Sequence, residues 1–282
     1  MSTLPLLKAI CRECYSEPEE VYRTLRRRGM DLVTVSDHDS IKAVETLGRH
    51  ENFFVSEEVT CQMPSGNELH VGVYDLTLRQ HEEIQRRRND LPRLVAYLNE
   101  QELFYSINHA FSALTGRRSP EDFIWFDGAF PGVEVRNGHS LERTNRLARR
   151  MARDSGRAVL GGSDAHTLRS LGSVCTRVPG ARNKAEFLAG LRCGRGQVQG
   201  TSGDFWRLTR DVLRIGAAMM EERPVARLLA PLVLAVPVVT LVNYLVEDLF
   251  ARYWGSRWER WRGLGRGAST RGLRPASGEA TA

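Results

Sequence analysis

Short apolar stretches alternate with amphipathic ones along most of the chain, and this alternation constrains the fold more than any other feature. Strands are expected at residues 31–35, 53–59, 68–74, 104–107, 132–135, 158–161 and 173–178. Helical periodicity is expected at residues 16–29, 78–98 (with an interruption near Pro92), 140–155 and 183–192. Strands that alternate with helices favour an α/β fold with a mainly parallel sheet, either open or closed into a barrel.

Polar residues follow several of these strands directly. They lie at residues 36–39, 108–109 and 162–166. The carboxyl ends of parallel strands share one face of such a fold. The sequence therefore predicts that these clusters converge on a single site.

Four of the seven histidines and two carboxylates lie on or directly after predicted strands: His38, His70, His109, His166, Glu58 and Asp164. Imidazoles and carboxylates are the ligands that Zn, Mn and Fe use in proteins. A single histidine at a strand end is more often a hydrogen-bonding residue than a ligand. Their coincident placement, together with the Asp164-x-His166 spacing that directs both side chains to one side, predicts a metal centre.

Five segments in order resemble the motifs of PHP (polymerase and histidinol phosphatase) domains. Residues 34–39 (TVSDHD) resemble the family's second motif, and residues 55–60 resemble the strand that bears a metal-bridging glutamate. Residues 68–70 resemble the next strand with its histidine. Residues 107–110 resemble I-x-H-P, with Ala110 in place of proline, and residues 162–166 match G-S-D-A-H. The resemblance covers residues 16–200.

This resemblance implies a distorted (β/α)7 TIM-like barrel that holds two or three divalent metal ions. It implies hydrolysis of a phosphoester, as a phosphatase or phosphodiesterase, by a metal-bound hydroxide. The implied metal ligands are His38, Glu58, His70, His109, Asp164 and His166. Asp37 would orient His38, so Asp37, His38 and Asp164 are the predicted catalytic residues.

One motif of the family has no counterpart in this sequence. PHP domains open with His-x-His on a first strand, whereas no histidine precedes His38 here. Either the sequence starts at an internal methionine and the first strand lies upstream, or the motif is truly absent. We favour the first explanation because the other ligands are intact. The second would make the chain a catalytically impaired PHP-like binding or regulatory module.

Candidate substrate contacts are Arg117, Arg118 and Asn137, for a small phosphorylated substrate. Guanidinium groups bind phosphate through paired hydrogen bonds, although a solvated basic turn would explain the two arginines equally well. Glu134 and His139 follow the same strand as Asn137. An amidohydrolase-like barrel uses similar ligands on carbon–nitrogen bonds, but no lysine on a predicted strand supports that reading.

Residues 228–246 are nineteen residues without a charge, enough for a helix to cross a bilayer. Arginines and aromatic residues follow as far as Arg262, as they would at a membrane interface. The segment 228–262 is therefore predicted to associate with a membrane, as a span or as an interfacial anchor. The alternative is an apolar helix that packs on the barrel or on a partner subunit.

We expect three regions: a PHP-type domain at 1–203, a helical membrane-associated segment at 204–265, and a disordered tail at 266–282. Residues 204–282 carry +4 of the net charge of +6, so the first region is not a basic nucleic-acid-binding surface. Five cysteines and no secretory signal indicate reduced thiols in the cytoplasm, at the inner face of the membrane if the anchor is used. The oligomeric state is left open.

Overall fold

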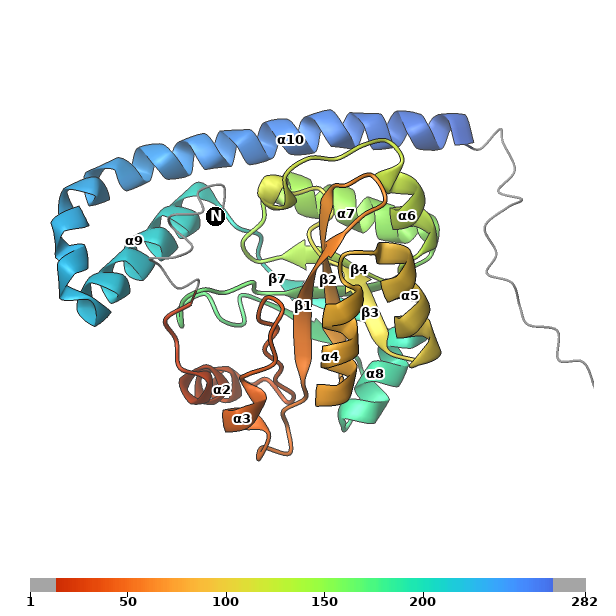
Figure 1. Cartoon of the computed structure of the whole chain (residues 1–282), viewed down its shortest axis with the longest axis horizontal. Helices are drawn as coiled ribbons and strands as arrows, with labels where there is room; N and C mark the ends of the chain where they lie inside the picture. The colour runs from red at the N-terminus through yellow and green to blue at the C-terminus, as the bar shows by residue number, and fades with distance from the viewer. Residues whose placement is uncertain (1–13, 266–282) are drawn as a thin grey trace, which may run out of the picture.

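The computed structural model describes residues 14–265 (Figure 1). The predicted disordered tail, residues 266–282, lies outside the described residues. The chain forms a central sheet with helices around it, which confirms the predicted α/β class.

The central sheet has five strands in sequence order: β1 (Ser56–Gln62), β2 (Glu68–Tyr74), β3 (Phe104–Ile107), β4 (Gly132–Asn137) and β5 (Ala158–Gly162). β2 pairs antiparallel with both β1 and β3, whereas β4 pairs parallel with both β3 and β5. A tight turn at Gly66, whose φ is +83°, joins β1 to β2 and makes that pair antiparallel. The sheet is therefore mixed, not mainly parallel as predicted.

The predicted distorted (β/α)7 barrel is not confirmed, because the described strands form an open sheet. A separate antiparallel pair consists of β6 (Val174–Arg177) and β7 (Gln197–Gly200). The strand predicted at residues 31–35 forms a single isolated bridge, from Val33 to Phe53, and His38 bridges Glu58 beyond it. Within residues 31–40 only Val33 is buried, so this segment lacks the apolar face that would hold it as a regular strand.

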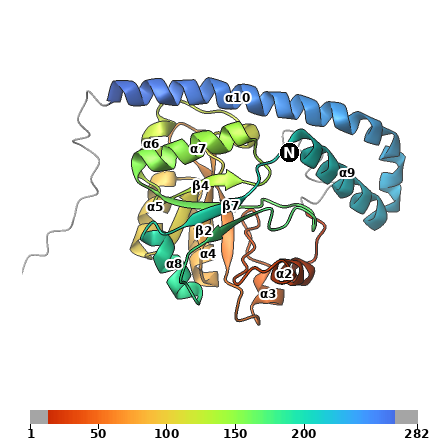
Figure 2. The same ribbon diagram turned by 180° about the vertical axis from the view of Figure 1, so that it is seen from behind.

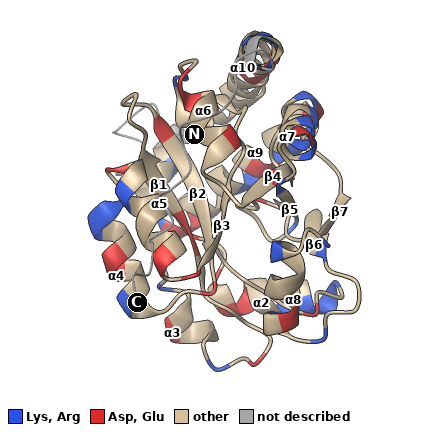
Figure 3. Ribbon diagram, turned by 90° about the vertical axis from the view of Figure 1, so that its right-hand side faces the viewer, with Lys and Arg blue, Asp and Glu red and all other residues tan. Residues whose placement is uncertain are grey.

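Helices surround the sheet: α2 (Pro18–Arg27), α3 (Val44–Leu47), α4 (Leu78–Arg87), α5 (Leu91–Glu100), α6 (Asp122–Gly128), α7 (Glu142–Ser155) and α8 (Lys184–Arg192). The interruption predicted near Pro92 is confirmed: the stretch 78–98 is divided into α4 and α5, and Asp90 caps the second helix by accepting from the Arg93 amide at 3.1 Å. A short 3-10 helix, η1 (Ala113–Thr115), follows β3. Figure 3 shows charged residues on the outer helices α4 and α7.

The C-terminal segment consists of α9 (Phe205–Glu222), the 3-10 helix η2 (Pro224–Ala235) and the long helix α10 (Val236–Gly265). One end of α10 lies along the body beside α7, while its other end reaches past the body next to α9 (Figures 1 and 2). Trp258 of α10 is 1% exposed and belongs to the main apolar core together with Phe111 and Phe123. The second half of α10 is therefore part of the packed body.

Candidate metal centre

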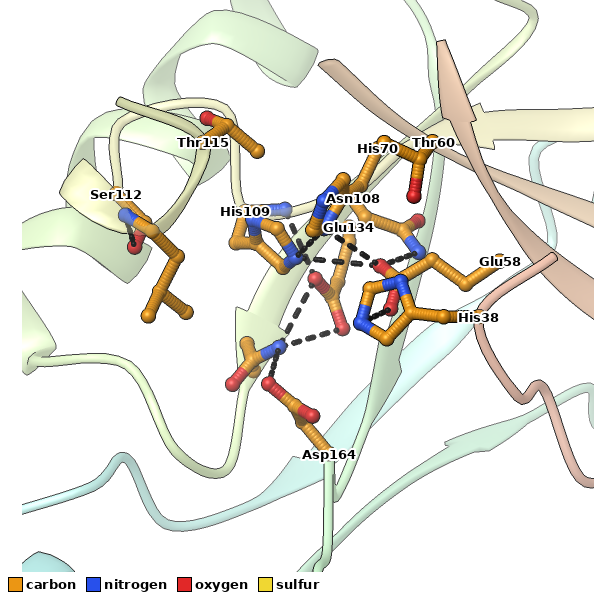
Figure 4. A network of polar contacts seen from close by, with 12 residues as sticks. His38, Glu58, Thr60, His70, Asn108, His109, Ser112, Thr115, Glu134 and Asp164 are labelled. Atoms are coloured by element: carbon orange, nitrogen blue, oxygen red, sulfur yellow. Dashed lines mark hydrogen bonds and ion pairs between the residues drawn. The ribbon is translucent and has the colours of Figure 1, made fainter. Parts of the chain in front are cut away.

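A buried carboxylate lies at the middle of the site. Glu58 is at the third position of β1 and is 8% exposed. Its oxygens lie 3.4 Å from His38 Nε2, 3.6 Å from His70 Nδ1 and 3.2 Å from His109 Nε2 (Figure 4). Three imidazoles from three separate segments of the chain thus converge on one carboxylate.

Backbone hydrogen bonds attach the turn that carries His38 to β1. The amide of Glu58 donates to the Asp37 carbonyl at 3.1 Å, and the amide of Asp39 donates to the Glu58 carbonyl at 3.0 Å. The Asp39 carboxylate accepts from the Thr60 amide at 2.9 Å and pairs with Arg88. This turn replaces a full strand and holds His38 next to Glu58.

A chain of polar side chains orients Glu58 from the neighbouring strands. Asn108 donates to Glu58 Oε1 at 2.8 Å, and Ser106 donates to Asn108 Oδ1 at 2.9 Å. Gly72 of β2 leaves room for this chain, since a Cβ there would lie 2.9 Å from Asn108 Oδ1. The sequence did not predict a role for Asn108. Its position directly before His109 was the only feature of the sequence that placed it near the site.

A second polar group lies across the site on β4 and after β5. Glu134 accepts from the backbone amide of His109 at 2.9 Å. Asn137 Nδ2 donates to Glu134 Oε2 at 3.2 Å and to Asp164 Oδ2 at 3.1 Å, so it links the two carboxylates. His166 Nδ1 lies 3.8 Å from Asp164 Oδ1.

His139, whose role the sequence left open, also lies in this group. Its ring centroid is 5.6 Å from that of His166. Of the predicted site residues, the structure thus gathers His38, Glu58, His70 and His109 on one side, and Asn137, Asp164 and His166 on the other. The His109–Glu134 hydrogen bond joins the two sides.

The electrostatics of the site favour the ionised forms of Glu58 and Asp164 but oppose ionisation of Glu134. Burial alone would raise the pKa of Glu58, but the hydrogen bond with His109 and the charges of the three imidazoles lower it to about 2. Burial likewise opposes ionisation of Asp164, yet His166, His139 and His109 lower its pKa. Burial raises the pKa of Glu134 to about 7. Glu58 and Asp164 are therefore charged at neutral pH, as cation ligands must be.

Two site residues have backbone conformations that side chains rarely adopt. His109 has a φ of 29° and Asp164 a φ of 46°. A non-glycine residue with positive φ costs roughly 1–3 kcal/mol and is common at functional sites. The surrounding hydrogen bonds hold both side chains in place despite this strain.

The donor set fits a divalent cation. His38, Glu58 and His70 each offer a ligand atom, and these atoms lie within 4.8 Å of one another. His109 Nδ1 is buried and has no hydrogen-bond partner among the described residues. Imidazole nitrogens around a carboxylate are a typical ligand set for Zn, Mn or Fe.

The site opens into a cavity of about 1150 Å³. Both sides of the site contribute to the cavity wall: His38 and Glu58 from one side, and Asp164 and His166 from the other. Asp37 is exposed on the same wall, consistent with a position beside His38. A substrate entering this cavity would meet both sides of the centre at once.

The predicted substrate arginines lie elsewhere. Arg118 is 5% exposed, and its guanidinium donates to the Glu68 carbonyl at 2.7 Å and to Thr115. Arg117 is exposed but does not line the cavity. The turn that follows β3 directs Arg118 inward to satisfy backbone carbonyls, so the phosphate-binding role predicted for the pair is not supported by their placement.

Replacing Arg118 with alanine is expected to lower the free energy of unfolding by about 3 kcal/mol, because the carbonyls of Glu68 and Ala110 and the buried Thr115 hydroxyl lose their donor. Urea unfolding followed by circular dichroism measures this change. Arg117→Ala serves as the matched control and is expected to change stability by less than about 0.5 kcal/mol. Equal effects of the two substitutions would contradict a structural role for Arg118.

Residues 142–195 match a protein-family model described as PHP-associated. This segment includes Asp164 and His166 of the site. The resemblance to PHP proteins is confirmed. No curated protein matches the PHP-like chain.

Solved structures with a related fold include PsfC from Pseudomonas syringae PB-5123. The two chains share 17% identity with a TM-score of 0.52, over 72% of this chain and 88% of PsfC. A candidate metal-dependent phosphoesterase from Bifidobacterium adolescentis is 14% identical, with a TM-score of 0.46 over 66% of this chain and 93% of that one. The lesion-specific endonuclease PfuEndoQ from Pyrococcus furiosus is 16% identical, with a TM-score of 0.47 over 64% of this chain and 52% of PfuEndoQ. The similarity to PsfC shows a shared fold.

Proposed function

We propose that this PHP-like chain is a metal-dependent hydrolase and that its substrates are phosphoesters. The observation that carries the proposal is the convergence of three imidazoles on the Glu58 carboxylate. The second group, with Asp164 and His166, lies across the same cavity. Such a pair of ligand groups suits two or three cations that act on one phosphate.

His38, Glu58, His70 and His109 would hold a cation on one side, and Asp164 and His166 on the other. Bound Zn, Mn or Fe would activate water and neutralise the charge of the phosphate. The protein's own residues prepare the site for this chemistry. Asn108 and Asn137 orient the Glu58 and Asp164 carboxylates through hydrogen bonds, as groups that support metal ligands commonly do.

Two other arginines are better placed than Arg117 and Arg118 to bind the phosphate. Arg177 and Arg182 are exposed and line the cavity that holds the metal centre. Their guanidinium groups offer paired donors for phosphate oxygens. We therefore assign substrate attraction to these residues, together with Asn137 at the centre of the site.

The test is metal analysis of the purified full chain, combined with turnover of a substrate panel. The panel contains a phosphomonoester, a phosphodiester, a nucleotide, a sugar phosphate and a short oligonucleotide. Asp164→Ala and His166→Ala are each expected to lower turnover by about a hundredfold. Glu82→Ala, an exposed residue of α4, is the control and should leave turnover unchanged.

Unchanged turnover in Asp164→Ala and His166→Ala would show that the site assignment is wrong. A wild-type chain that binds metal but hydrolyses nothing in the panel would instead support the alternative of a PHP-like binding module. Removal of metal with a chelator, followed by separate addition of Zn, Mn or Fe, identifies the cation that restores activity.

A further inference from the structure

Exposed apolar side chains gather on one part of the molecule. We call residues 205–249, which comprise α9, η2 and the first part of α10, the C-terminal arm. Of the fifteen large hydrophobic side chains that are exposed among the described residues, twelve lie between Trp206 and Leu249. Leu228 and Leu234 are more than four-fifths exposed, at 81% and 85%. An exposed apolar patch of this extent indicates a binding surface.

The exposed side chains of α10 are mainly apolar in its first part, which reaches past the body, and mainly polar in the part that lies along the body. Val238, Val242, Leu245 and Leu249 are spaced to lie on one face and are all exposed. Farther along the helix, where α10 covers the body, exposed positions include Arg252, Ser256 and Arg260. The exposed apolar side chains of α10 thus concentrate on its first part, which reaches past the body in Figure 1, with Tyr253 as the exception farther along.

By length and composition the stretch Ala230–Gly263 could cross a membrane, and 11% of its most apolar window is buried. Packing within the arm and contacts with the body both oppose a crossing. Thr240, within the apolar run, forms a 2.7 Å hydrogen bond with Thr209 of α9.

The two ends of the arm are attached to the body near the metal centre. Asp211 of α9 accepts from Thr167 at 2.9 Å and from Ser170 at 2.5 Å. Glu247 of α10 is 8% exposed and accepts from Ser112 at 3.0 Å and from the Ala113 amide at 3.1 Å. A span would break these contacts, whereas an arm that lies along a surface keeps all of them.

We propose that the C-terminal arm binds the surface of a lipid bilayer, with its apolar face at the level of the acyl chains. Within the arm the exposed charged residues are Arg210, Arg223 and Arg227, with Glu221 and Glu222 at the α9–η2 turn, whereas the acidic Asp211 and Glu247 are buried. The excess of arginine suits anionic headgroups. A symmetric second copy would instead bring the same arginines against one another, which disfavours a dimer through this face.

Flotation of the full chain with lipid vesicles tests this inference. One set of vesicles contains phosphatidylcholine alone, and the other is an equimolar mixture of phosphatidylcholine and phosphatidylglycerol. The chain is expected to float with the mixed vesicles and to bind the neutral ones more weakly. The triple variant Val238→Gln, Val242→Gln, Leu245→Gln is expected to bind at least about a hundredfold more weakly, because three apolar side chains no longer leave water.

The matched control is Leu78→Gln, which removes an equally exposed apolar side chain, 64% exposed, from α4 outside the arm. It should float like the wild type, and thermal unfolding checks that both variants remain folded. Absence of flotation by the wild type, or equal flotation by the triple variant, would overturn the proposal. So would sedimentation showing a dimer without lipid that the triple variant abolishes.

An alkaline carbonate wash of the lipid-bound chain separates the two modes of attachment. A chain bound along the surface is released by the wash, and this is the expected result. Retention in the membrane fraction would overturn the placement along the surface and would indicate a span. Neither outcome depends on hydrolysis, so failure of the proposed enzymatic function remains distinguishable from failure of the arm.

Discussion

Under the proposed function, replacement of Glu58 with glutamine is expected to abolish metal binding and to lower phosphoester hydrolysis by about a thousandfold. Glutamine keeps the shape of the side chain but loses the negative charge that His38, His70 and His109 surround. The remaining imidazoles would then hold a cation without a compensating charge. Metal content after dialysis, measured by mass spectrometry, is the primary readout, and turnover is the second.

Glu82→Gln is the control for this substitution, because it removes one negative charge from an exposed position on α4. It should leave both metal content and turnover unchanged. Thermal unfolding of Glu58→Gln shows whether the variant is folded. Metal retention equal to that of the wild type would refute the central role of Glu58, independently of the turnover result.

Truncation of Trp258 to alanine is expected to lower the free energy of unfolding by about 3–5 kcal/mol. The indole is 1% exposed and meets the Phe111 ring edge to face, with ring centroids 5.6 Å apart. Its loss leaves a cavity between α10 and the body. Urea unfolding followed by circular dichroism or fluorescence gives the value.

Tyr253→Ala is the matched control on the same helix. Tyr253 is 50% exposed and points away from the core, so a change below about 1 kcal/mol is expected. A helix that served only to cross a membrane would lose little stability in water from either substitution. Similar small effects of the two would therefore contradict the packing of α10 on the body.

The local patterns of the sequence were sufficient to place most strands and the order of the motif residues. Alternating apolar stretches located β2, β3, β4 and β5 to within a few residues, because strand burial leaves a short-range signature. The region 31–35 was an exception. Its apolar residues predicted a strand. A regular strand also needs hydrogen bonds to a neighbouring strand along its length, and here only the isolated Val33–Phe53 bridge forms.

Contacts between distant segments were decided by the tertiary structure alone. Arg118 is directed to the carbonyl of Glu68, fifty residues away, and not to the cavity. Asn108 and Asn137 acquire their roles only when β1, β4 and the segment after β5 meet. The carboxylate of Glu247 marks the end of an apolar run in the sequence, yet in the fold it reaches the turn after His109.

The sequence by itself determined which residue types stand at strand ends, and therefore that a site rich in imidazole and carboxylate groups was expected. Only the tertiary structure decided that the sheet stays open and that half of α10 joins the core while the other half is left uncovered. The physical reason is that the periodicity of a sequence indicates which side of a helix or strand is apolar. Which other segment packs against that side depends on contacts across the whole chain.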